Sequence, residues 1–106
     1  MILRPDKVLS LLGIAAKAGR VASGEFSTEK AVKEGKAYLV MVASDASENT
    51  KKRFSDMCAY YSCEYFEYSD KDRLGQCIGK EFRASLAVTN EGLANELKKY
   101  LTITTE

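Results

Sequence analysis

Hydrophobic residues recur along the chain in two alternating patterns, one with helical spacing and one of nearly unbroken apolar runs. The helical spacing predicts five helices: one from Pro5 and Asp6 to Gly19, one over 27–34, one that Asn49 or Thr50 caps, one from its cap Ser69 through Ile78, and one that Asn90 caps. Extended or apolar runs predict about four strands, over 20–23, 38–43, 63–68 and 84–89.

Strict alternation of helices and strands is typical of a sheet with helices on both faces. We therefore expect an α/β fold, a three-layer α/β/α sandwich around a mostly parallel or mixed sheet of about four strands. The length of 106 residues fits one domain over 1–106, with no linker or repeat.

The composition excludes several classes of function but says little more about the fold. The chain has no His, which excludes Ser-His and Cys-His nucleophile pairs and His-bearing zinc sites, so we expect no enzyme. The net charge is only +1, but residues 1–53 carry 10 basic and 6 acidic side chains while residues 54–106 carry 6 and 9. The basic half indicates an anionic partner only weakly.

The three cysteines, at positions 58, 63 and 77, do not have the spacing of zinc ligands. We favour small buried hydrophobic residues over metal or redox roles, and we expect no cofactor. Arg4, Asp6 and Lys7 interrupt any signal-peptide core, and no apolar run approaches the roughly 20 residues that cross a bilayer. These features predict a cytoplasmic protein with reduced thiols and no membrane partner.

The first candidate site is the strand-to-helix turn over 23–30, followed by Lys33. Free N–H groups at a helix start, with Gly24 allowing close approach, suit a phosphate, and Lys30 and Lys33 share a face of the helix. The alternative is an ordinary capped helix with a solvated basic face. Glu25 and Glu29 count against an anion site because they would repel a phosphate.

The second candidate is the glycine-bordered segment 74–83, which offers Lys80, Phe82 and Arg83 before a strand. An aromatic ring and two cations can stack on and pair with unstacked bases. The alternative is a helix C-cap followed by a core Phe. A third basic stretch, 51–53, opposes the helix dipole, and we favour a solvated face for it.

Together these segments resemble the kink-turn RNA-binding ribosomal proteins of the L-seven-Ae and L-thirty-e type. The resemblance is carried by Gly24–Lys30, Ala31-Val32, Gly35, Ala37, Leu39–Ala43 and Asp45, and by Leu74-Gly75, Ile78-Gly79 and Arg83 leading into Ala84–Thr89. Similarity to the family's bacterial YlxQ-type branch is carried by Leu12–Arg20, Ser23-Gly24, Asp45, Asn49–Lys52 and Gly79-Lys80.

The resemblance implies a non-catalytic, ribosome-associated binder of structured, kink-turn-like RNA, with ribosomal RNA and ribosomal proteins as partners. Nothing in the sequence calls for a dimer, so we expect a monomer. Where the family has an Asn-Glu pair that contacts guanines, this chain has Phe26 and Ser27. The alternative is a protein-interaction module on the same fold with little RNA affinity. The RNA-binding residues that the resemblance and the motifs together imply are Gly24, Glu25, Phe26, Ser27, Lys30, Lys33, Lys80, Phe82, Arg83 and Ala84.

Overall fold

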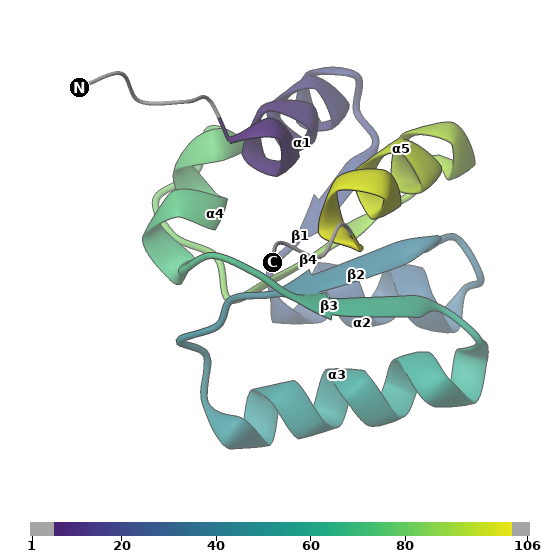
Figure 1. Cartoon of the computed structure of the whole chain (residues 1–106). Helices are drawn as coiled ribbons and strands as arrows, with labels where there is room; N and C mark the ends of the chain where they lie inside the picture. The colour runs from purple at the N-terminus through teal and green to yellow at the C-terminus, as the bar shows by residue number, and fades with distance from the viewer. Residues whose placement is uncertain (1–5, 103–106) are drawn as a thin grey trace.

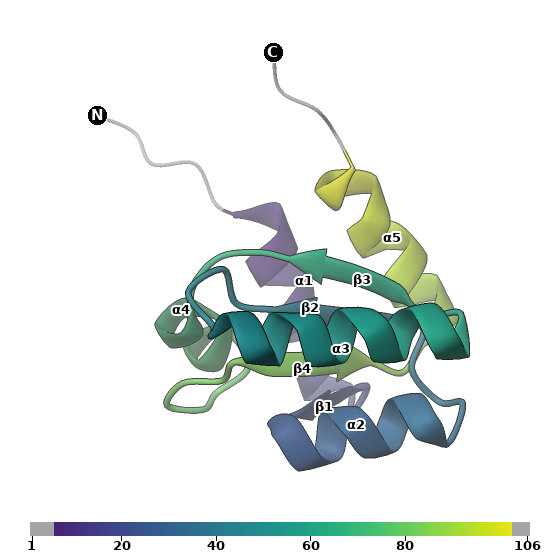
Figure 2. The same cartoon turned by 90° about the horizontal axis from the view of Figure 1, so that it is seen from below.

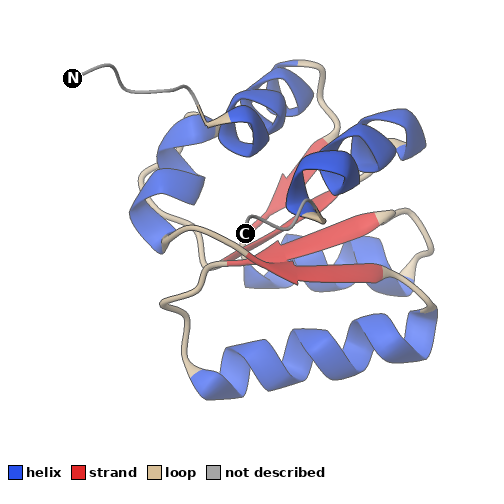
Figure 3. Ribbon diagram, viewed as in Figure 1, coloured by secondary structure: helices blue, strands red, loops and turns tan. Residues whose placement is uncertain are grey.

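The structure is a computed structural model, and it describes residues 6–102. Over this range five helices and four strands alternate, as the hydrophobic pattern predicts (Figure 1, Figure 3). In chain order the elements are α1 (Lys7–Lys17), β1 (Val21–Ser23), α2 (Glu25–Lys33), β2 (Leu39–Val42), α3 (Glu48–Tyr61), β3 (Glu64–Glu67), α4 (Lys71–Cys77), β4 (Ser85–Val88) and α5 (Glu91–Leu101).

The four strands form one sheet in the order β1-β4-β2-β3. β2 and β3 are parallel, with Leu39 opposite Glu64, whereas β4 is antiparallel to both of its neighbours. The prediction of a mixed sheet is therefore confirmed, and the alternative of a mostly parallel sheet is wrong. The difference arises because β4 inserts between β1 and β2 and runs against both, a long-range pairing that local periodicity does not encode.

Helices cover both faces of the sheet, which gives the predicted α/β/α sandwich. α1, α4 and α5 lie on one face, and α2 and α3 lie on the other (Figure 1). Every residue of the central strands β2 and β4 is buried, as expected for strands between two helix layers. The core that these strands share with the helices includes Leu12, Phe54, Leu74 and Leu97, none of which is exposed.

The caps of α3 and α4 differ from the prediction. Ser47, and not Asn49 or Thr50, caps α3, and its hydroxyl accepts the N–H three residues ahead at 3.1 Å. Asp70, and not Ser69, caps α4 in the same way at 2.8 Å. In both places several adjacent residues have capping side chains, so the choice depends on where the preceding loop turns. Ser69 itself adopts a left-handed conformation, with φ of 61°.

The starts of the other helices are closer to expectation. Asn90 caps α5 as predicted, and Asp6 caps α1, whereas Pro5 lies outside the described residues. Helix α2 begins at Glu25, two residues before the predicted start at position 27. The chain turns from β1 into α2 at Gly24, whose φ of 93° is accessible mainly to glycine.

Candidate functional site

The two segments singled out by the sequence lie together at one end of the sheet. The Arg83 guanidinium Nε donates to the Ser23 hydroxyl at 3.1 Å, and the Gly24 N–H donates to the Ser85 carbonyl at 2.9 Å. Figure 2 shows the start of α2 on the same side of the molecule as the loop between α4 and β4. Because β4 pairs antiparallel with β1, residues about 60 positions apart become neighbours.

The start of α2 is open toward solvent. Gly24 provides no side-chain cap, and the first intrahelical bond runs from the Thr28 N–H to the Gly24 carbonyl at 2.9 Å. The N–H groups of the first turn therefore have no partner within the helix. A Cβ built on Gly24 would have no heavy atom within 4 Å, so a ligand has room to approach the backbone here. This is the geometry in which a helix start binds an anion.

A buried hydroxyl pair holds α2 in place against β4. The Ser85 hydroxyl donates to Thr28 Oγ1 at 3.3 Å, and both side chains are almost completely buried. Ser23 and Thr28 fall within the candidate turn over 23–30, but sequence reasoning gave Ser85 no role, since a hydroxyl residue in a strand carries no motif. Thr28 and Ser85 hold α2 against β4, and Ser23 accepts the hydrogen bond from Arg83.

Three predicted residues line a groove along α2. Phe26, Ser27 and Lys30 border a hollow of about 280 Å³, and Phe26 is 77% exposed. Lys30 is exposed and makes no ion pair with the part of the chain that the structure describes. The other lining residues are Ala22, Ala31, Glu34, Lys36 and Thr89.

The loop before β4 is held close to α4. The Lys80 N–H donates to the Gly75 carbonyl at 2.8 Å, and a Cβ on Gly75 would lie 2.4 Å from the Cα of Phe82. Phe82 is 55% exposed, so the alternative of a core Phe is wrong. The half-buried Ala84 continues toward β4, where its carbonyl accepts the Ala43 N–H at 2.9 Å. The loop thus presents its aromatic ring and its lysine outward while its backbone is fixed.

The carboxylates that count against an anion site have cationic partners. The Arg53 guanidinium of α3 donates to both Glu25 and Glu29 of α2, and Lys33 pairs with Glu29 at 2.7 Å. The hydrogen bond and the negative charge of Glu29 raise the pKa of Lys33. Lys33, expected to act together with Lys30, is thus paired with Glu29 and does not line the groove that Lys30 lines.

The other two residues of the basic stretch 51–53 also have acidic partners. Lys52 pairs with Asp56 at 2.9 Å, and its exposed side chain fits the predicted solvated face. Lys51 approaches Glu48 and Glu67 at 3.6 and 3.8 Å, and its side chain is only 18% exposed. For Lys51 the prediction of a solvated face is wrong because the lysine packs between α3 and β3.

The cysteines lie in two separate places. Cys58 is buried as predicted and adjoins Cys63, whose N–H donates to the Cys58 carbonyl at 2.8 Å. Interaction with the Cys63 side chain, followed by burial, raises the pKa of the Cys58 thiol, and interaction with Cys58 lowers the pKa of Cys63. Cys77 is at the end of α4, and burial raises its pKa to about 11. Residues 6–102 contain no group of three side chains suited to hold a metal ion.

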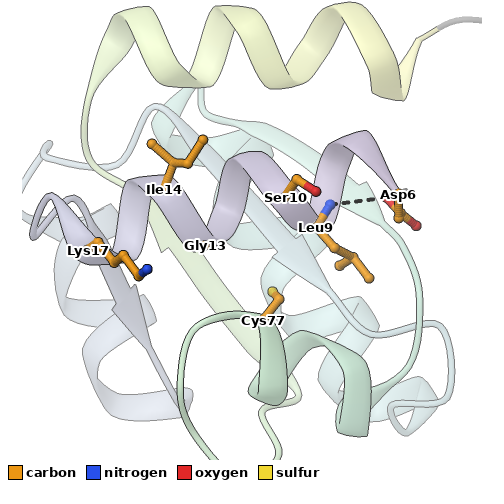
Figure 4. A pocket seen from close by; sticks show the side chains of 7 residues that line it. All are labelled: Asp6, Leu9, Ser10, Gly13, Ile14, Lys17 and Cys77. Atoms are coloured by element: carbon orange, nitrogen blue, oxygen red, sulfur yellow. Dashed lines mark hydrogen bonds between the residues drawn. The ribbon is translucent and has the colours of Figure 1, made fainter. Parts of the chain in front are cut away.

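A second hollow, of about 540 Å³, lies between α1 and α4 (Figure 4). The two helices approach closely because Gly13 has no side chain: a Cβ there would lie 2.9 Å from the Cys77 carbonyl oxygen. Ile14 borders this hollow and is 58% exposed. Its two charged lining residues, Asp6 and Lys17, have opposite signs, so it lacks the cationic character of the surface around the start of α2.

No helix within residues 6–102 combines the length and the apolar character that crossing a membrane requires. The chain is an α/β/α sandwich in which the uncapped start of α2 lies beside a basic, aromatic loop at one end of the sheet. The model of the Ribosomal protein L7Ae/L30e/S12e/Gadd45 family matches residues 6–98, and the chain belongs to this family. The chain is not an enzyme: its family is named after the ribosomal proteins L7Ae, L30e and S12e together with Gadd45, and two of its relatives are named RNA-binding proteins.

Two relatives carry the name RNA-binding protein YlxQ. The Bacillus subtilis (strain 168) protein is 44% identical over 87 residues, covering 82% of this chain and 87% of the relative. The Enterococcus faecium protein is 37% identical over 96 residues, covering 91% and 92%. The expected resemblance to the YlxQ-type branch is thereby confirmed.

Solved structures show the same fold. A Bacillus halodurans protein described as having unknown function superposes with a TM-score of 0.90 at 35% identity, covering 93% of this chain and all of the other. The Giardia lamblia 15.5kD RNA binding protein superposes with a TM-score of 0.77 at 19% identity, covering 95% and 90%. The second likeness establishes the fold alone.

Proposed function

We propose that this chain binds structured RNA without catalysis, as one RNA-binding domain, through the surface formed by residues 24–30 and 80–84. The observation that carries the proposal is the convergence of these two segments, which the Arg83–Ser23 bond and the pairing of Gly24 with Ser85 hold together. Membership of a ribosomal-protein family and the RNA-binding names of two relatives support it.

Each part of this surface has a role that RNA chemistry requires. The free N–H groups after Gly24 can bind a phosphate, and Lys30, Lys80 and Arg83 supply positive charge around it. The exposed rings of Phe26 and Phe82 offer faces on which unpaired bases can stack. Glu25 forms an ion pair with Arg53, and Lys33 forms one with Glu29. These two residues therefore affect RNA binding through the net charge beside the surface.

The preferred RNA is a kinked duplex, and the partners are ribosomal RNA and ribosomal proteins. A kink exposes unstacked bases next to a bent backbone, which is the combination that an aromatic loop beside an open helix start suits. Phe26 and Ser27 cannot make the bidentate contacts of an amide and a carboxylate. We therefore propose recognition by stacking and backbone shape more than by base edges.

The test is a titration of the purified protein into a labelled kink-turn RNA and a matched unkinked duplex at two salt concentrations. Preferential, salt-sensitive binding to the kink supports the proposal. A double variant, Lys30→Gln with Lys80→Gln, should weaken binding by about tenfold or more because two phosphate contacts are lost. Lys99→Gln is the control, since it removes one positive charge from α5, on the opposite face of the sheet.

A dissociation constant above about 100 μM for both RNAs at low salt would overturn the proposal, because nonspecific binding alone reaches that range. That result would favour the protein-interaction module as the function. Equal affinity for the two RNAs would overturn the kink preference and retain a general RNA-backbone binder.

A further inference from the structure

The Arg53 side chain connects α3 to the helix that carries the proposed RNA surface. Its guanidinium donates one N–H to Glu25 and another to Glu29, one turn further along α2. The side chain is 38% exposed, and the same guanidinium lies 5.5 Å from the centroid of the Phe54 ring. A planar guanidinium can bridge two carboxylates in this way, whereas the ammonium of a lysine is a single point charge.

The two carboxylates occupy an unfavourable place for an RNA-binding helix. Glu25 is the first residue of α2, directly after the open turn at Gly24, and Glu29 follows one turn later. Unpaired, they would place two negative charges where the proposed surface receives a phosphate, and like charges brought together at an interface oppose binding. With Arg53 and Lys33 as partners, the formal charge of this group of four side chains is zero.

We propose that Arg53 is a positioning residue for RNA binding: it neutralises Glu25 and Glu29 and holds their carboxylates toward α3, away from the path of the RNA backbone. This inference rests on the proposed function and extends it to a residue of α3 outside the two binding segments. With Glu25 and Glu29 neutralised, the positive charge of the surface comes from Lys30, Lys80 and Arg83.

The experiment compares RNA affinities of Arg53→Gln and of the triple variant Arg53→Gln, Glu25→Gln, Glu29→Gln with that of the unaltered protein. Arg53→Gln should weaken binding about tenfold at low salt, because two carboxylates are left with one cationic partner. The triple variant should recover affinity to within about threefold, since it has neither the cation nor the two anions. Lys52→Gln is the matched control, because Lys52 is adjacent on α3 but pairs with Asp56 of its own helix.

Recovery of RNA affinity in the triple variant distinguishes an electrostatic role of Arg53 from a purely structural one, in which it only connects α2 to α3. The triple variant still lacks every hydrogen bond that Arg53 makes to α2, so a structural role would leave its RNA affinity low. Urea denaturation of the same variants checks that each is folded during the titration.

Four outcomes contradict the inference. Unchanged affinity of Arg53→Gln, or failure of the triple variant to recover, overturns the role of Arg53 while the proposed function stands. An equal loss of RNA affinity in Lys52→Gln would mean that the effect of Arg53→Gln is one of net charge alone, and it would also overturn the inference. Absence of RNA binding by the unaltered protein overturns this inference together with the proposed function.

Discussion

At the scale of single residues, Gly24 and Gly75 serve the proposed surface for different physical reasons. Gly24 has open space around it, and its requirement is conformational, since φ is 93°. Gly75 has an ordinary helical backbone, and its requirement is steric: an added Cβ would lie 2.4 to 2.7 Å from backbone atoms of Glu81 and Phe82. Backbone cannot move aside as a flexible side chain can.

Gly75→Ala should therefore lower the free energy of unfolding by about 2 kcal/mol, through overpacking between α4 and the loop that follows it. Urea denaturation measures this change. The matched control is Gly92→Ala in α5, where the nearest atom to the new Cβ is the Asn90 Oδ1, 3.4 Å away. That substitution should alter stability by less than about 0.5 kcal/mol. Equal effects in the two variants would contradict the steric explanation.

At the scale of elements, the first helix depends on a contact made by a residue 62 positions away. The Tyr68 hydroxyl donates to the Asp6 carboxylate, with oxygen distances of 2.8 and 2.9 Å, while Asp6 accepts the Leu9 N–H at 3.0 Å. Tyr68 thus fixes the capping carboxylate of α1 from the segment that follows β3. A helix cap that looks purely local in the sequence is completed by tertiary structure.

Tyr68→Phe should lower the free energy of unfolding by about 1 kcal/mol near neutral pH, because it removes a hydrogen bond to a carboxylate. Burial, followed by the Asp6 hydrogen bond and charge, raises the pKa of Tyr68 to about 12. Since the folded-state pKa exceeds the unfolded value of about 10, the stabilisation is complete below pH ~10 and is lost as the pH rises toward ~12.

Denaturation curves of the two proteins at neutral and alkaline pH test this. The difference in the free energy of unfolding between Tyr68→Phe and the unaltered protein should become smaller at high pH. A difference that grows instead would contradict the sign of the pKa shift.

At the scale of the whole molecule, the net charge is only +1, but the charged side chains are distributed unevenly. Many of the basic side chains are paired with carboxylates, including Lys33, Lys51, Lys52 and Arg53. The proposed RNA surface gathers cations that lie far apart in the sequence. Local charge, and not net charge, is what a phosphate backbone meets.

The salt dependence of RNA binding follows from this arrangement. If Lys30, Lys80 and Arg83 supply the phosphate contacts, the logarithm of the affinity should fall with the logarithm of salt concentration with a slope of roughly −2 to −3. The double variant of Lys30 and Lys80 should reduce the slope to roughly −1. Filter-binding or fluorescence titrations over several salt concentrations measure it, and a slope near zero would contradict a phosphate-directed surface.

Sequence pattern alone predicted the elements because their causes are local. Helical spacing after Asn90 and the apolar run over 38–43 depend on residues a few positions apart, and α5 and β2 formed where these patterns indicated. The two candidate binding segments were also found from residue types: a glycine at a helix start, and cations with an aromatic ring in a loop. The cap residues of α3 and α4 were harder to predict because several adjacent side chains could cap each helix.

Tertiary structure alone decided which of these parts meet. The insertion of β4 against β1 brings Arg83 to Ser23 and joins the two candidate binding segments. The packing of α3 on α2 brings Arg53 to Glu25 and Glu29, which changes two apparently repulsive carboxylates into neutralised ones. These contacts join residues 24 to 60 positions apart, and their partners are set by how the whole sheet and its helices pack, which no local pattern encodes.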